Sequence, residues 1–208
     1  MCSPHPPLSR PLLWGKQQRR SPLVTEPGAG FSPVVTLTRT EFDGFVLGES
    51  RELSLIDSSG GNRNAVLTMV GQARRSIDIV SRSLDRPIFN DRDVADAIRS
   101  FIVRSGRGRI RVLVRDPSHA IAHGHRLINA AQRLSTFIEL RTFGQEHRNF
   151  NTALVIVDRI GTVIRHFGDR YEGEVSFNNP VEGRDWTRVI DEMWTSSVTD
   201  PNLRSIHT

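Results

Sequence analysis

The sequence predicts an α/β fold, with a mixed β-sheet flanked by helices. From residue 64 onward, segments with apolar residues at helical spacing alternate with segments in which apolar residues occupy every second position. These segments have the lengths found in βαβ units. Toward the end of the chain, several strand-like segments follow one another with no helix between them, so the sheet must also contain antiparallel strands. Together these observations predict one layered domain.

Helices are expected over 65–74, 91–104, 124–134 and 184–196. Three of them place a row of apolar side chains on one face. These faces comprise Val66, Met69, Val70 and Ala73 in the first helix, Ala97, Ile98, Phe101 and Ile102 in the second, and Trp186, Val189, Ile190, Met193 and Trp194 in the last. The second helix also begins with Asp91 and Asp93, whose negative charge favours a helix amino terminus.

Strands are expected over 76–81, 109–115, 136–141, 153–157, 162–167 and 175–177. In the first strand, Ile77 and Ile79 alternate with polar residues and therefore share one face. Arg109 and Arg111 share one side of the second strand for the same reason. Arginines lie at or near the edges of several strands, and ordinary salt bridges with the many acidic residues explain most of them.

Three segments are expected along the chain. Residues 1–33 hold most of the 11 prolines and show no hydrophobic periodicity, which predicts a disordered tail rich in proline and arginine. Two explanations of this tail stay open: a genuine extension, and sequence translated from a misassigned start. Residues 34–61 are expected to form an extended lead-in and linker, since DSSGGNRN over 57–64 has the composition of a turn. The α/β domain is expected over 62–208.

The composition excludes several classes of protein. Cys2 is the only cysteine, so neither an intrachain disulfide nor a cysteine-based metal cluster can form. No apolar stretch approaches the roughly 18 residues that indicate a membrane span, and we expect a cytoplasmic location. The formal net charge is +5, from 28 basic and 23 acidic residues, which is a weak argument for nucleic-acid binding. We expect no cofactor.

Three phrases carry a resemblance to a known family: LDRPIFNDRDVADAIRSFI, HGHRLINAAQRLSTFIELR and EMWTSSVTDPNLR. With the block from NTALVIVD to FNNP, they resemble one half of the phospholipase D superfamily. The resemblance is closer to an uncharacterised bacterial family of phospholipase-D-like half domains, sometimes fused to GNAT acyltransferases. It covers residues 62–208 and implies a phospholipase-D-like half domain.

The superfamily motif is His-x-Lys-x4-Asp, and the resemblance places it at Asn151, Ala153 and Asp158. In the family, one histidine attacks phosphorus, a second protonates the leaving oxygen, and lysines hold the phosphoryl oxygens. The carboxamide of Asn151 can neither attack phosphorus nor protonate a leaving oxygen. The methyl group of Ala153 cannot hold an anion. Asp158 alone matches, and an aspartate at such a place is common in turns. We therefore expect a degenerate, non-catalytic domain.

A site for a phosphorylated ligand is expected where the parallel strands end, because open α/β sheets bind ligands there. Arg115 and Arg141 lie at the ends of two strands, and arginine can hold a phosphoryl group through two parallel hydrogen bonds. His125 and Arg126 begin the next helix, whose free amides favour an anion. With Asn151, these four residues form the expected ligand-binding set.

Several alternatives stay open. One is a phosphodiesterase whose catalytic histidine has moved to His125 or His147. Another is a regulatory module for an acyltransferase partner. His119 and His123 have a spacing that can chelate a metal, but a proline and a glycine interrupt the segment, and no metal site is expected. The resemblance also implies a homodimer, and the ligand is expected to be a phosphorylated small molecule or a nucleic-acid backbone.

Overall fold

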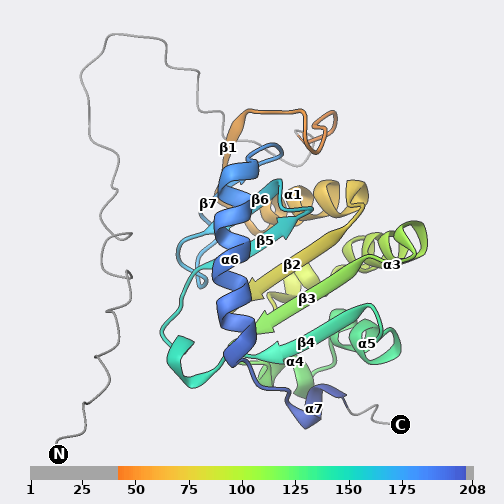
Figure 1. Cartoon of the computed structure of the whole chain (residues 1–208), viewed down its shortest axis with the longest axis vertical. Helices are drawn as coiled ribbons and strands as arrows, with labels where there is room; N and C mark the ends of the chain where they lie inside the picture. The colour runs from red at the N-terminus through yellow and green to blue at the C-terminus, as the bar shows by residue number, and fades with distance from the viewer. Residues whose placement is uncertain (1–41, 205–208) are drawn as a thin grey trace, which may run out of the picture. The chain divides into compact units, whose positions relative to one another are not determined.

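A computed structural model of the chain describes residues 42–204. Its strands form one mixed seven-stranded sheet in the order β1-β7-β6-β5-β2-β3-β4 (Figure 1). The strands are β1 Leu53–Ile56, β2 Ser76–Ser81, β3 Arg109–Val114, β4 Ile138–Thr142, β5 Ala153–Val157, β6 Gly161–Arg165 and β7 Gly173–Ser176. β2, β3 and β4 are parallel, and the remaining neighbours pair antiparallel. The expected α/β fold is confirmed, and the expected tail over 1–33 lies outside the described residues.

Helices cover both faces of this sheet. They are α1 Ser59–Gln72, α2 Arg86–Phe89, α3 Arg92–Ser105, α4 Ser118–Ala122, α5 Arg126–Arg133, α6 Pro180–Ser196 and α7 Pro201–Arg204, with a 3-10 turn, η2, at Gln145–His147. In Figure 1, α6 lies in front of the sheet, and α1, α3 and α5 lie behind it. The larger hydrophobic core forms on the side of α1 and α3, and a smaller one lies beneath α6. Among the described residues, no helix is long and apolar enough to cross a membrane.

The alternation of each strand decides which side chains enter which core. In β2, Ile77 and Ile79 belong to the core on the α1 side, whereas Val80 belongs to the core beneath α6. β5 and β6 are buried along their whole lengths because both of their faces are covered. A strand with two covered faces is apolar throughout, which explains the continuous ALVIV run.

The described part of residues 34–61 differs from the expected lead-in and linker. Phe42 is buried and its ring packs 5.7 Å from that of Phe177, and β1 pairs with β7 at the edge of the sheet. The turn-like DSSGGNRN begins α1, because the Ser58 hydroxyl caps the helix by accepting the Gly61 N–H at 3.1 Å. A Cβ at Gly61 would lie 3.4 Å from Ile56, so the glycine that suggests a turn allows close packing here.

Two ends of the sheet matter for function. We call the end where β2, β3 and β4 finish the carboxyl edge; Arg82, Arg115 and Phe143 follow these strands there. The end where they begin is the amino edge. Because β5 is antiparallel to β2, with Ile77 opposite Val157, the chain enters β5 at the carboxyl edge and leaves it at the amino edge. The sheet therefore separates Asn151 and Ala153 from Asp158.

Candidate functional site

Asn151 and Ala153 lie at the carboxyl edge, and Asp158 lies at the amino edge in the turn between β5 and β6. Asp158 and Arg159 have φ values of 53° and 61°, as both central residues of a type I′ turn require. The Ile160 N–H closes this turn on the Val157 carbonyl at 3.0 Å. The turn expected at Asp158 is therefore present, away from the other two motif positions.

The Asp158 carboxylate binds the backbone at the start of β2. It accepts the N–H groups of Arg74 at 2.9 Å, Arg75 at 2.7 Å and Ser76 at 2.9 Å. An ionised carboxylate makes hydrogen bonds of this kind about twice as strong as those between neutral groups. Asp158 thus joins the β5–β6 turn to the α1–β2 connection, which is a structural role that needs no substrate.

A buried arginine stands next to Ala153. Arg165 on β6 is the cross-strand partner of Ala153, and its side chain is 5% exposed. Its guanidinium forms an ion pair with Asp85 and donates to the Arg170 carbonyl at 3.0 Å. It also lies 5.7 Å from the ring centre of Tyr171. A positive charge is therefore present beside position 153, but it comes from the neighbouring strand and is held inside the protein by Asp85.

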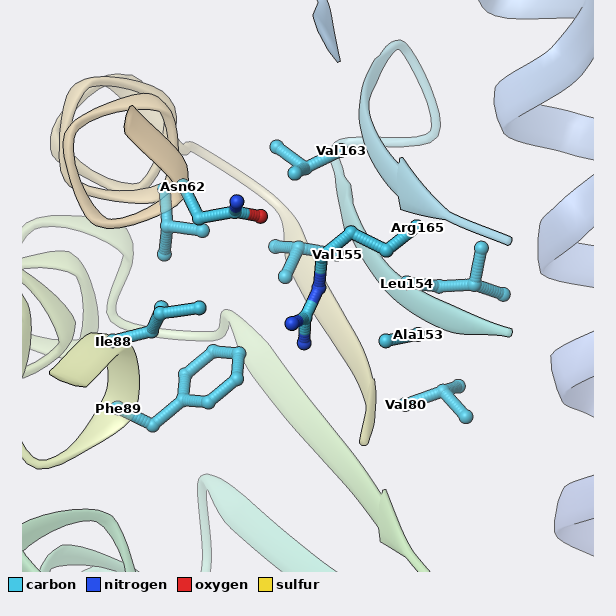
Figure 2. A pocket seen from close by; sticks show the side chains of 10 residues that line it. Asn62, Val80, Ile88, Phe89, Ala153, Leu154, Val155, Val163 and Arg165 are labelled. Atoms are coloured by element: carbon cyan, nitrogen blue, oxygen red, sulfur yellow. The ribbon is translucent and has the colours of Figure 1, made fainter. Parts of the chain in front are cut away.

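The Arg165 guanidinium closes the space in front of Ala153. Figure 2 shows it reaching past Ala153 and Val155 toward Ile88 and Phe89. The cavity that remains has a volume of about 10 Å³, close to the least that admits one water molecule. A phosphodiester does not fit there in this arrangement.

Asn151 lies half-buried just before β5. Its carbonyl oxygen accepts the Gly168 N–H at 2.6 Å, and a Cβ at Gly168 would lie only 2.9 Å from that oxygen. Gly168 therefore allows the β6–β7 connection to close over Asn151. Within residues 42–204, the half-buried Asn151 carboxamide makes no hydrogen bond.

Carboxylates lie near two arginines of the carboxyl edge, Arg82 and Arg115. Arg82 lies 3.8 Å from Asp169, and about half of each side chain is exposed. The pKa of Asp116 is lowered, first by the hydrogen bonds it accepts from Ser118 and then by the positive charges of Arg115 and Arg82. The carboxylates of Asp169 and Asp116 thus reduce the net positive charge around Arg82 and Arg115.

The structure gives His125 a different role from the one expected. Its ring is 1% exposed; Nδ1 accepts the Leu127 N–H at 3.2 Å as the amino-terminal cap of α5, and Nε2 lies 3.1 Å from the Leu84 carbonyl. This pattern requires a neutral ring with the proton on Nε2. Burial, assisted by the charge of Arg86, lowers the pKa of His125 from 6.5 to about 4. With both nitrogens engaged, His125 can neither bind a phosphate nor attack one.

The other two expected ligands are also placed apart. The exposed Arg126 uses its backbone N–H to donate to Asn90 Oδ1 at 2.8 Å, so the protein itself occupies this amide of α5. Arg141 lies on the α6 side of β4, where its Nε donates to Glu139 at 2.8 Å. Its guanidinium also stacks 4.5 Å from the ring centre of Trp194. Of the expected set, the side chains of Asn151, Arg115 and Arg126 make no hydrogen bond or ion pair within residues 42–204.

His119, His123 and His147 belong to no cluster of three or more metal-binding side chains among the described residues. The rings of His119 and His123 stack at 4.3 Å, and His123 Nδ1 lies 3.0 Å from the His119 carbonyl. Within the described part of the chain, no group of three or more histidine, cysteine, aspartate or glutamate side chains could hold a metal ion. His147 in η2 lies 3.7 Å from the Glu146 carboxylate, with 15% of its side chain exposed.

A family model describing a domain of unknown function, DUF7931, matches residues 58–206. The chain belongs to this family. The DUF7931 match begins at the Ser58 cap of α1, four residues before the domain start expected from the sequence. No curated protein matches the chain.

Solved structures show that this DUF7931 domain has a phospholipase-D-like fold. Nuc from Salmonella typhimurium, a phospholipase D family member, has 18% identity and a TM-score of 0.50, covering 70% of this chain and 95% of Nuc. NucT from Helicobacter pylori has 17% identity and a TM-score of 0.51, covering 72% of this chain and 99% of NucT. TrmBL2, an archaeal chromatin protein described as showing a novel mode of DNA binding, has 14% identity and a TM-score of 0.54. The match covers 72% of this chain and 54% of TrmBL2, so the chain spans about half of that protein.

Sequence reasoning missed the Arg165–Asp85 pair. Arg165 is visible as an arginine inside an otherwise apolar strand, and Asp85 lies in the quoted phrase LDRPIF. The position of Arg165 in a strand buried on both faces indicates that it has an acidic partner, since a buried charge requires a partner. Identifying that partner required the fold.

Proposed function

We propose that this chain is a non-catalytic phospholipase-D-like domain that binds a phosphorylated ligand at the carboxyl edge. The observation that carries the proposal is the buried ion pair between Arg165 and Asp85 beside Ala153. The lysine position of the motif carries a methyl group, and the space in front of it is filled. Loss of a nucleophile alone commonly lowers the rate of an enzyme about 10⁴–10⁶-fold, and here the lysine is absent as well.

The proposed ligand contacts are the Asn151 carboxamide and the Arg115 guanidinium. Asn151 can donate a hydrogen bond to a phosphoryl oxygen, and Arg115 supplies the charge. The nearby carboxylates of Asp116 and Asp169 reduce the net potential, so we expect weak binding of free inorganic phosphate. TrmBL2 shares the fold and is described as binding DNA, which is compatible with a nucleic-acid backbone as the phosphorylated ligand.

Two measurements test this function. Hydrolysis of bis(4-nitrophenyl) phosphate should not exceed the background rate, and Asn151→Ala should not change it. Titration with inorganic phosphate, followed by ¹H–¹⁵N NMR, should shift the side-chain signals of Asn151 and Arg115. Arg115→Gln should weaken that response, and Arg188→Gln, on the outer face of α6, should not. Hydrolysis that disappears in Asn151→Ala would refute the non-catalytic assignment.

A second candidate is a phosphodiesterase that uses His147. The position of His147 Nε2, 3.7 Å from the Glu146 carboxylate, favours it, since a neighbouring carboxylate can orient a histidine. η2 also lies in the connection that leads to Asn151. Phosphohistidine trapping distinguishes the two functions: labelled His147 after exposure to a phosphodiester supports the enzyme, and an unlabelled protein supports the binding domain.

Two further proposals concern partners and rest on the family resemblance. One is a homodimer, which light scattering at micromolar concentration tests directly. The other is a regulatory role beside an acyltransferase. Co-purification with such an enzyme, together with no response to phosphate, would favour a protein partner over a phosphorylated ligand.

A further inference from the structure

Six exposed arginines gather at the amino edge, away from the motif positions Asn151 and Ala153. They lie on or directly beside three connections: between α1 and β2, between α3 and β3, and between β5 and β6. We call them the amino-edge arginine surface; its members are Arg74, Arg75, Arg104, Arg107, Arg109 and Arg159.

Hydrogen bonds join the three connections into one surface. The Arg109 N–H donates to the Arg75 carbonyl at 3.3 Å, which places β3 beside β2 where both begin. Arg104 Nη2 donates to the Gly71 carbonyl at 2.8 Å, which joins the end of α3 to the end of α1. The Asp158 carboxylate binds the amides of Arg74 and Arg75. These bonds hold the backbone that carries the arginines, so the surface is already assembled before any ligand arrives.

The guanidinium groups of this surface lack carboxylate partners. Eight other arginines in residues 42–204 form ion pairs with carboxylates, namely Arg63, Arg82, Arg92, Arg99, Arg111, Arg141, Arg165 and Arg188, whereas others such as Arg115 and Arg126 do not. None of the six amino-edge arginines takes part in an ion pair with a described residue. The one carboxylate bound to this surface, that of Asp158, is occupied by backbone amides.

We propose that the amino-edge arginine surface binds the phosphate backbone of duplex nucleic acid. Several unpaired guanidinium groups on adjacent connections match a ligand that carries a row of phosphates, because each can contact a phosphate through two hydrogen bonds. Of the large apolar side chains that are exposed in the described chain, Val103 is the one that belongs to a helix, strand or connection carrying these arginines. A single-stranded ligand would require exposed aromatic rings for base stacking, and a membrane surface would require several apolar side chains that insert. This site is separate from the proposed carboxyl-edge site and does not depend on it.

The salt dependence of duplex binding tests the proposal. Fluorescence anisotropy with a labelled DNA duplex of mixed sequence would be measured from about 50 to 200 mM KCl, over which several phosphate contacts change affinity strongly. We expect binding whose logarithmic salt slope falls by about 2–3 in R74Q/R75Q/R109Q, with affinity reduced about tenfold or more. The matched control is R92Q/R99Q/R188Q, which removes the same formal charge from exposed, ion-paired positions on α3 and α6. It should keep nearly the wild-type slope.

Each outcome bears on the proposal. Absence of duplex binding by the wild-type chain at the lowest salt overturns it, and so do equal losses in the two triple variants. Loss in Asn151→Leu with none in R74Q/R75Q/R109Q would place the contact at the carboxyl edge and also overturn it. Vesicles containing phosphatidylserine serve as a second probe; binding to them without binding to the duplex would replace nucleic acid by a membrane surface. Thermal melting of every variant shows that the fold is retained.

Discussion

The two ends of the sheet differ in how their arginines are paired with carboxylates. At the carboxyl edge, where the family resemblance places the chemistry, Arg165 is buried against Asp85 and Arg82 lies beside Asp169, while Arg115 has no ion pair with a described residue. At the amino edge, which carries only the motif aspartate, the arginines are exposed and have no carboxylate partner among the described residues. The position of a motif therefore does not by itself locate the charge available to a ligand. Substitutions at each edge can test this contrast.

The largest expected effect concerns the buried pair at the carboxyl edge. Asp85→Asn should lower the free energy of unfolding by about 3–5 kcal/mol, because it leaves the buried Arg165 charge without its partner. Urea denaturation measures this difference. Asp169→Asn is the matched control, since it removes the partner of the half-exposed Arg82 and should change stability by about 0–1 kcal/mol. Equal effects of the two variants would contradict the difference in burial.

The next effect is a loss of stability in acid caused by His125. Its pKa is lowered on folding from 6.5 to about 4. Below pH 6.5, His125 therefore becomes protonated in the unfolded chain but stays neutral in the folded chain. Stability from this group is therefore fully present above pH 6.5 and falls as the pH drops toward 4, by up to about 3 kcal/mol.

Denaturant titrations between pH 7 and 4 test the role of His125. His125→Asn keeps a good helix cap and removes the titrating ring, so it should flatten the dependence on pH. His166→Asn, at a side chain that is 60% exposed, should leave the dependence unchanged. An unaltered slope in His125→Asn would show that the ring is not held neutral.

At the amino edge, Asp158 should prove to be structural. Asp158→Ala should lower the free energy of unfolding by about 2–3 kcal/mol, because it leaves backbone amides without an acceptor and places alanine at positive φ. Asp158→Asn should lower it by only about 1–2 kcal/mol, since asparagine tolerates this conformation and keeps one acceptor oxygen. If the two variants are equally stable, the carboxylate does not support the turn as described.

The smallest effect separates two arginines of the carboxyl edge. Arg141→Ala should lower stability by about 0.5–1 kcal/mol through the loss of its contacts with Trp194 and Glu139. Its affinity for inorganic phosphate should stay unchanged. Arg115→Gln should weaken the binding of inorganic phosphate and leave stability nearly unchanged. Weaker phosphate binding in Arg141→Ala would show that Arg141 contributes to the ligand site.

Periodicity predicted most of the fold, and β5 is found over 153–157 as expected. The starts of two helices were missed for a local reason. Gly60 and Gly61 suggested a turn, but Ser58 caps a helix that includes them. The last helix was expected to start at residue 184, but it starts at Pro180. Proline is favoured in the first turn of a helix, and Asn179 caps this helix by accepting the Glu182 N–H at 3.2 Å.

The candidate site was less predictable, because its side chains depend on distant partners. The cap formed by His125 follows from its own neighbours, but its burial depends on Leu84, which lies far away in the sequence. The placement of Arg141 depends on Trp194 of α6, and that of Arg165 on Asp85. Patterns along one strand give the face of a residue, but they do not name the group that it meets.

The pairing of Ala153 with Arg165 also affects whether a lysine can be introduced at position 153. A lysine restored at position 153 would project toward the Arg165 guanidinium and place two cations in one small enclosed space. Removing Arg165 first would leave Asp85 without its counter-charge. Neither single substitution is expected to be neutral, so placing the superfamily's lysine at position 153 requires coordinated changes on three separate segments of the chain. The buried pair thus acts as a barrier against introducing that lysine by a single substitution.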